Sequence, residues 1–328
     1  MFVLDKMKTK NSSETENKLK IKIEKMKTKL KIIPALMIAA SLLFTACNDE
    51  DETPVMETKN IVEVAADAGN FSILIEAAQK AGLAEFLSTE NNLTVFAPTD
   101  AAFAALLSDL GLSSLDDIPV ADLTQILTYH VIGAKVMSTD LSTGYVPTLA
   151  SFNNNNISMY VEVGNGVSIN GSVSVTTADV EAENGVIHVV DKVILPPTVV
   201  SIALANENFT TLVQAVVKAG LVDALSAEGP FTVFAPTNAA FDALFAQLGI
   251  SGIDDLTAEQ LVPILTYHVV PGNVVSTDLS SGEVGTLNGQ NLSVDLSAGV
   301  KINESEVIAA DIQGSNGVIH VIDQVLIP

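Results

Sequence analysis

Apolar and polar residues alternate at two different spacings along the chain. Residues 71–78 place apolar side chains at helical spacing and end shortly before Gly82, which favours a helix with a glycine just beyond its last turn. Residues 94–96 are a short apolar run that stops at Pro98, as is typical of a strand. The first part of the chain therefore alternates helix and strand.

Two further helices and several strands follow. Thr99 is expected to cap a helix that carries Phe103 into the core, and residues 121–129 show a second helical pattern. The later positions change to short β-branched runs separated by Asn and Gly turns. These predicted strands are 157–163, 167–169, 173–176 and 186–194. Helices followed by a strand meander predict an α+β fold.

The chain contains the same unit twice. The matching segments are TVFAPT at 94–99 and 232–237, ILTYHV at 126–131 and 264–269, and NGVIHV at 184–189 and 316–321. The first two pairs are 138 residues apart and the third is 132 apart, so the second copy is six residues shorter. We expect two tandem domains, 60–196 and 198–328, that abut across a short, stiff Pro-Pro junction.

The repeated motifs resemble those of the fasciclin domain. TVFAPT is similar to its first sequence block, the Tyr-His pair to its central motif, and NGVIHV followed by Val or Ile and Asp to its second block. The resemblance covers essentially all of residues 60–328. It implies an α+β domain in which a seven-stranded β-wedge packs against several helices. It also implies a secreted or membrane-anchored adhesion or matrix protein rather than an enzyme.

The resemblance further implies a candidate partner-binding surface. In animal members of the family, integrin contact is associated with the Tyr-His region and with an Asp-Ile pair just before the second block. Integrins are animal receptors, so this carries over only as the location of a surface, and the alternative is that these residues are structural framework. The matching residues are Tyr129, His130, Asp179, Val180, Tyr267, His268, Asp311 and Ile312.

All four histidines occupy equivalent places in the two copies: His130 with His268, and His188 with His320. A histidine among β-branched neighbours favours a half-buried, hydrogen-bonded side chain over a metal ligand or catalytic base. His130 ends a predicted helix, where a cationic ring would suit the negative end of the helix dipole. The chain shows no HExxH, GxSxG, P-loop or GxGxxG motif, so we predict no catalytic residue, metal site or cofactor.

Composition narrows the function classes. Of 328 residues, 16 are Lys, none is Arg and 39 are acidic, which gives a formal charge of -23 and argues against a nucleic-acid partner. A single Cys excludes a disulfide framework within one chain and Cys-rich metal centres. A glycan-binding accessory lipoprotein is the alternative function, but no Trp and only four Tyr supply little surface for stacking sugars. A hydrolase is disfavoured because no nucleophile–base–acid set is found.

The N-terminal region has the opposite charge to the rest. Ten Lys lie in residues 1–31, whereas from Cys47 onward six Lys face 35 acidic residues. Residues 32–44 form an apolar run too short to span a bilayer, which predicts a signal segment over 1–46, with Met26 as an alternative start. The run ends in FTAC and resembles a bacterial lipobox, which makes Cys47 the lipidated N-terminus. The alternative is an ordinary signal peptide with an incidental Cys.

Residues 47–59 then form an acidic tether that begins NDEDE after the Cys. Such a run is either a solvated spacer or an export signal to the outer face of an outer membrane, and both remain open. The sequence predicts a lipid-anchored outer-membrane protein of the cell envelope that displays two adhesion or protein-interaction domains. Its partner is an unknown protein or matrix component, besides the membrane that its anchor enters.

Overall fold

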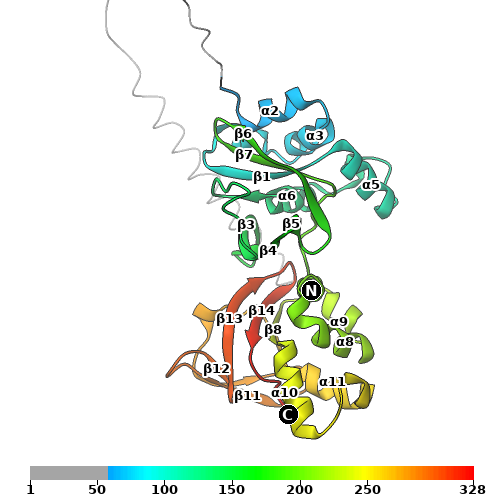
Figure 1. Ribbon diagram of the computed structural model, residues 1–328, viewed down its shortest axis with the longest axis vertical. Helices are drawn as coiled ribbons and strands as arrows, with labels where there is room; N and C mark the ends of the chain where they lie inside the picture. The colour runs from blue at the N-terminus through cyan, green and yellow to red at the C-terminus, as the bar shows by residue number, and fades with distance from the viewer. Residues whose placement is uncertain (1–57) are drawn as a thin grey trace, which may run out of the picture. The chain divides into compact units, whose positions relative to one another are not determined.

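The computed structural model describes residues 58–328 (Figure 1). The predicted signal segment (1–46), Cys47 and the tether up to residue 57 lie outside the described residues. Within 58–328, no helix combines the length and apolar character needed to cross a bilayer.

The first part of the first repeat contains all of its helices and two of its strands, and the other five strands follow. Its helices are α2 (Ile61–Ala68), α3 (Ser72–Lys80), α4 (Ala84–Thr89), α5 (Asp100–Leu110) and α6 (Val120–Tyr129), with a 3-10 turn η1 (Leu115–Asp117). Its strands are β1 (Leu93–Pro98), β2 (Val131–Ile132), β3 (Gly144–Phe152), β4 (Asn155–Gly164), β5 (Gly166–Ile169), β6 (Val173–Ala182) and β7 (Gly185–Val190). The seven strands form one sheet in the order β2-β1-β7-β6-β5-β4-β3.

The second repeat has the same order of elements. Its helices are α7 (Val199–Leu204), α8 (Thr210–Lys218), α9 (Val222–Ser226), α10 (Asn238–Leu248) and α11 (Ala258–Tyr267), with 3-10 turns η2 (Glu207–Phe209), η3 (Ile253–Asp255) and η4 (Ser276–Asp278). Its strands are β8 (Phe231–Pro236), β9 (Val269–Pro271), β10 (Gly282–Gly285), β11 (Asn291–Asp295), β12 (Lys301–Ile302), β13 (Ser305–Gln313) and β14 (Gly317–Ile322). The sheet order, β9-β8-β14-β13-β12-β11-β10, matches that of the first repeat.

Each sheet contains one parallel strand pair, formed by the second and third strands in the sheet order, while the other pairs are antiparallel. In this pair β1 lies beside β7 with Phe96 opposite His188, and β8 lies beside β14 with Phe234 opposite His320. All six residues of β1 are buried, as expected for a strand covered on both faces. Two of the three recurring motifs, TVFAPT and NGVIHV, therefore pair with each other in the core of each repeat. The α+β architecture predicted from sequence is confirmed.

Local sequence explains the ends of the predicted helices. The Thr99 side chain accepts a hydrogen bond from the backbone of Ala102 and begins α5, as predicted. α3 ends one residue before Ala81, and Gly82 takes the left-handed conformation with φ of 70°. Phe103 is fully buried on α5.

Several strand predictions need correction. β3 was not predicted, because Pro147 interrupts its apolar pattern; this strand lies at the edge of the sheet, where a missing N–H is tolerated. β6 runs to Ala182 rather than 176, with irregular register, and β7 stops at Val190 rather than 194.

Candidate functional site

The Tyr-His pair lies in the interior at the end of a helix in each repeat. Tyr129, the last residue of α6, is fully buried and its hydroxyl donates to the carbonyl of Ser158 at 2.9 Å. The same hydroxyl accepts from Asn170 Nδ2 at 3.0 Å, and Tyr267 is held by equivalent bonds. Burial raises the pKa of the Tyr129 hydroxyl well above its usual 10. The tyrosine therefore ties the helix to the sheet.

His130 and His268 are neutral and use both ring nitrogens. In His268 the Nδ1–H donates to the carbonyl of Ile264 at 2.8 Å, and Nε2 accepts the backbone N–H of Leu326 at 2.9 Å. Burial lowers the pKa of both histidines from 6.5 to about 4. The expectation of a cationic ring at the helix end was wrong, because desolvation outweighs the helix dipole and Nε2 is already occupied.

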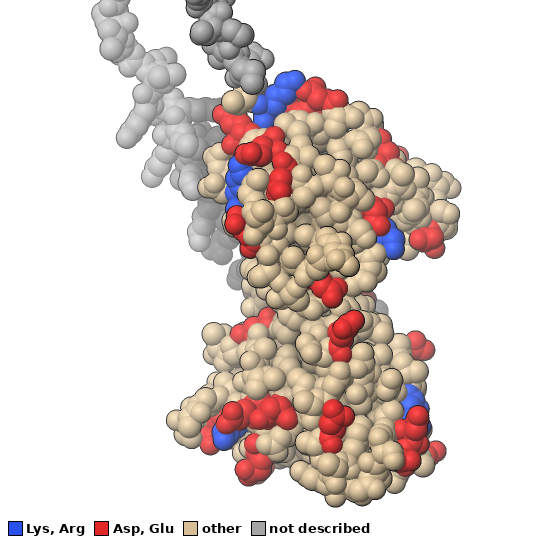
Figure 2. All heavy atoms as spheres, in the orientation of Figure 1, with Lys and Arg blue, Asp and Glu red and all other residues tan. Residues whose placement is uncertain are grey.

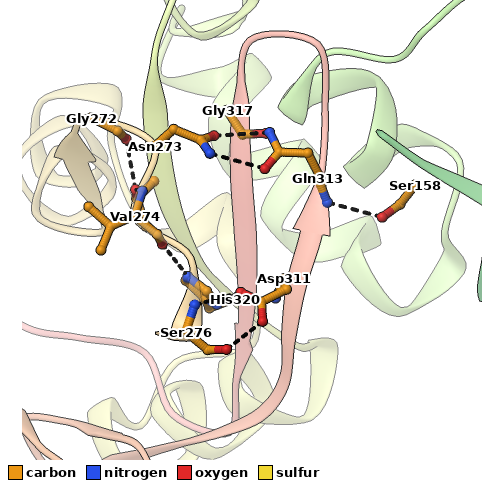
Figure 3. Close-up of polar contacts among 10 residues, drawn as sticks. Ser158, Gly272, Asn273, Val274, Ser276, Asp311, Gln313, Gly317 and His320 are labelled. Atoms are coloured by element: carbon orange, nitrogen blue, oxygen red, sulfur yellow. Dashed lines mark hydrogen bonds and ion pairs between the residues drawn. The ribbon is translucent and has the colours of Figure 1, made fainter. Parts of the chain in front are cut away.

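The second pair of histidines has the opposite tautomer. His320 donates from Nε2 to the carbonyl of Val274 at 2.9 Å, and its Nδ1 accepts the backbone N–H of Asp311 at 3.3 Å (Figure 3). The ring stacks on Phe234 with centroids 5.7 Å apart. Burial lowers the pKa of His320, opposed by the Val274 carbonyl and the Asp311 carboxylate. His188 makes the same bonds in the first repeat. Both rings are fully buried, whereas the sequence predicted half-buried histidines.

Asp179 and Asp311 hold a loop against the sheet. Both have positive φ, 60° and 63°, a left-handed conformation that Asp tolerates better than most residues. The Asp311 carboxylate accepts the backbone N–H of Ser276 at 2.6 Å and also its hydroxyl (Figure 3). Asp179 binds Ser138 in the same way. These bonds to Ser138 are the main cause of the lowered pKa of Asp179.

The predicted partner-binding residues fall into two groups. Tyr129, His130, Tyr267, His268 and Ile312 have buried side chains, and Val180 is half-buried. The side chains of Asp179 and Asp311 are 30% and 41% exposed. Of the eight predicted residues, the two aspartates therefore have the side chains most accessible to a partner. Partner contact at these residues stays a prediction.

The Ser276, Asp311 and His320 side chains are neighbours but do not form a catalytic triad. A triad needs the imidazole between the hydroxyl and the carboxylate, so that it can take the hydroxyl proton. Here the hydroxyl donates directly to the carboxylate, and His320 Nε2 donates to a carbonyl. This arrangement fixes a loop, and the imidazole is not placed to take the proton of the serine hydroxyl.

Two other polar residues in each repeat were not assigned a role from sequence. Asn316 Oδ1 accepts the backbone N–H of Val199, which begins α7, while its Nδ2 donates to the carbonyls of Leu225 and Ala227, each at 2.9 Å. Thr232 similarly accepts from Val274 and donates to Gly272. Both residues lie in segments that recur in the two copies, and that recurrence was the available signal. The equivalents are Asn184 and Thr94.

One polar pair differs between the copies. In the first repeat Lys135 forms an ion pair with Glu181 at 3.0 Å. In the second, Asn273 and Gln313 exchange amide hydrogen bonds of 3.1 and 2.9 Å, and the Gln313 backbone N–H donates to Ser158 Oγ (Figure 3). The framework bonds are thus common to both repeats, while this neighbouring pair is not.

The surface around these sites is acidic. From residue 58 onward the chain carries six Lys and 30 acidic residues. The face in Figure 2 shows carboxylates spread over both repeats, with Lys beside some of them. Among the described residues, no group of three or more His, Cys, Asp or Glu side chains is placed to hold a metal ion.

The fold and site define a class of protein: two copies of an α+β module whose recurring polar residues hold the framework together. The chain belongs to the fasciclin domain family, whose model matches residues 69–196 and 207–328. Tandem fasciclin domains are typical of adhesion and protein-interaction modules, and members of the family are generally non-catalytic.

Several known proteins are similar to this chain. Protein sll1483 of Synechocystis sp. is 55% identical over 132 residues, covering 40% of this chain and 73% of that protein. Transforming growth factor-beta-induced protein ig-h3 of Sus scrofa is 29% identical over 279 residues, covering 84% of this chain but 40% of the relative. Periostin of Homo sapiens is 28% identical over 275 residues, and the chain spans 31% of it.

A solved structure shares the fold of the tandem pair. The FAS1 domain pair from the insect cell adhesion molecule Fasciclin I matches with a TM-score of 0.51 and 21% identity. The match covers 80% of this chain and 98% of the other. At this identity the likeness establishes the fold.

Proposed function

We propose that this protein is a lipid-anchored adhesion or interaction protein of the cell envelope, in which Cys47 carries the anchor and the fasciclin pair engages a partner. The observation that carries the proposal is the tandem pair itself, because it is similar to a domain pair from a cell adhesion molecule. The apolar run and the FTAC sequence before Cys47 support the anchor.

The mechanism is display. Acyl chains on Cys47 hold the chain in the bilayer, with about 0.8 kcal/mol gained for each buried methylene. The acidic tether keeps the repeats away from the membrane because its charges repel one another. The repeats then present a rigid surface whose acidic groups include Asp179 and Asp311.

The anchor is tested by feeding labelled palmitate to cells that express the parent chain or Cys47→Ala. We expect label in the parent and none in the variant. Label that persists in Cys47→Ala would refute the anchor. Protease treatment of intact cells tests the location: digestion supports the outer face, whereas a chain that is protected until the cells are lysed contradicts it.

The adhesion role is tested by comparing attachment of cells that express the parent chain, Cys47→Ala or no chain. We expect attachment with the parent alone, because the unanchored variant leaves the cell. Equal attachment without the chain would refute the role.

The surface is tested with Asp311→Asn and Ser276→Ala. Ser276→Ala removes the bond between these two side chains and Asp311→Asn weakens it, but only Asp311→Asn removes the exposed charge. Loss of attachment in Asp311→Asn alone, with both variants folded by circular dichroism, supports direct contact by the carboxylate. Equal attachment by both variants and the parent would exclude Asp311 from the surface.

A further inference from the structure

The second repeat contains an apolar cavity that its polar framework does not use. The cavity measures about 110 Å³ and lies among α7, α8, α9 and the start of the sheet. Its walls include Val199, Val213, Val233 and Leu265, and His268 is the one polar side chain that reaches it. Both nitrogens of that ring are already bonded within the fold. A ligand here would therefore find no free hydrogen-bonding side chain.

The first repeat provides an internal comparison. Equivalent residues line a cavity of about 40 Å³, with Ile61 and Ile75 at the places of Val199 and Val213. Each of these isoleucines carries one methylene more than the valine. Two other wall positions differ in the opposite sense, with Ala78 and Ala84 at the places of Val216 and Val222. The two cavities thus have equivalent walls that differ at four positions, and the cavity of the first repeat is the smaller.

The mouth of the cavity also differs. In the second repeat Leu204 and Val217 line the cavity while 62% and 59% exposed, which is unfavourable for apolar side chains unless something covers them. The first repeat has Ala66 and Gln79 at these places, both exposed. The apolar rim therefore accompanies the larger cavity.

Charge around the mouth selects against an anionic ligand. Asp223 is exposed on α9 and follows Val222, which lines the cavity, in the sequence, and Glu207 follows α7. The nearest cation on these helices, Lys218, donates to the carbonyls of Ile253 and Asp254. A carboxylate or phosphate headgroup at this mouth would meet like charge and no free ammonium.

We propose that the second repeat binds a neutral aliphatic chain, such as that of an uncharged lipid or fatty alcohol. The end of the chain enters the cavity, and its continuation lies over Leu204 and Val217. An apolar cavity of about 150 Å³ is enough to bind benzene. A cavity of 110 Å³ therefore accommodates the last few carbons of a chain. The site is independent of the anchor and of the adhesion role.

Binding is measured with the full chain carrying Cys47→Ala, so that no attached acyl chain competes. The neutral dye N-phenyl-1-naphthylamine reports occupancy, and decanol or decanoate at pH 8 displaces it. We expect one dye site per chain and displacement by decanol at concentrations at least about tenfold lower than by decanoate, because only the latter is charged. Equal displacement by the two, or no dye binding, would overturn the proposal.

Substitutions taken from the first repeat locate the site. Val199→Ile with Val213→Ile fills the cavity with the residues that the equivalent fold already holds. The two added methylenes occupy space that the ligand would otherwise fill, so the ligand buries less apolar surface. We expect at least about tenfold weaker binding. Leu204→Ala with Val217→Gln removes the apolar rim and should weaken binding severalfold. The matched control, Ala66→Leu with Gln79→Val, puts the apolar rim on the small cavity and should add no second site.

Thermal unfolding checks that each variant is folded, and sedimentation checks its mass. Unchanged dye affinity in the folded Val199→Ile, Val213→Ile variant would place the dye elsewhere and overturn the proposal. A parent dimer that dissociates in Leu204→Ala, Val217→Gln would show that a second copy covers the mouth, which also overturns it. A monomeric parent whose dye binding falls in both second-repeat variants confirms the site.

Discussion

Replacing the buried histidines at the helix ends should make the stability of the protein less sensitive to mild acid. His130 and His268 have a pKa of about 4 in the folded chain, against 6.5 for the unfolded reference. The unfolded chain therefore binds a proton first as the pH falls. The stability that each neutral ring contributes is complete above 6.5 and is lost between 6.5 and about 4.

The size of the effect follows from the two pKa values. Each histidine destabilises the folded state by about 3 kcal/mol once the pH is below 4, and by about 2 kcal/mol at pH 5 relative to pH 7. The lowered pKa of Asp179 acts below 3.8, because the stability that its carboxylate contributes is present above that value. The interval from pH 7 to 5 thus isolates the histidines, and the lowered pKa of His320 adds a loss of stability in the same direction.

The assay is urea unfolding followed by circular dichroism at pH 7 and pH 5, at constant ionic strength. His130→Gln and His268→Gln each lose buried hydrogen bonds and should be less stable at both pH values. Each should nevertheless lose about 2 kcal/mol less than the parent between pH 7 and 5. Tyr267→Phe is the control, since it removes a buried hydroxyl bond without removing a histidine. If both Gln variants show the parent's full loss, the buried neutral imidazoles are not its cause.

Three further substitutions test the framework by urea unfolding at pH 7. Gly317→Ala places a Cβ 2.3 Å from the carbonyl oxygen of Phe231, so the β8–β14 pair must shift; we expect about 3 kcal/mol of destabilisation, and less than 1 kcal/mol would contradict the close approach. Asn316→Asp keeps the shape but loses both amide donor bonds, and we expect about 2–4 kcal/mol; a neutral result would show these bonds to be dispensable. Asp311→Asn weakens the bonds to Ser276 and should speed hydrogen exchange at the Ser276 amide, and unchanged exchange would contradict the loop-holding role.

The sequence predicted α3, α5 and α6 because their signals are local, whereas α2 and α4 were not predicted. Thr99 before an apolar helix and Gly82 after another act through their own backbone neighbourhood, and both occur as expected. Pro147 is also local, but its meaning depends on position in the sheet. At an edge its missing N–H leaves no partner unsatisfied, so β3 forms despite it. The edge position is set by the whole strand order, which no short window contains.

The candidate site was harder to predict because its residues act through distant partners. His130 was placed correctly at a helix end, but its charge depends on how deeply the fold buries it and on a backbone donor at position 194. Asp311 was singled out as a surface residue, while its bond to Ser276 spans 35 positions. For both residues the residue type indicated a polar role, and the structure was needed to identify the hydrogen-bonding partner.

The duplication separates framework from function more clearly than either copy alone. Residues that recur and are buried, such as Asn184 and Asn316, make the same bonds in both repeats, so their recurrence reflects the requirements of the fold. Positions that differ at equivalent sites are free of that requirement. Leu204 stands where the first repeat has Ala66, and its exposed apolar side chain buries little surface within the fold. It accompanies the larger cavity, as expected if the second repeat alone has acquired a ligand.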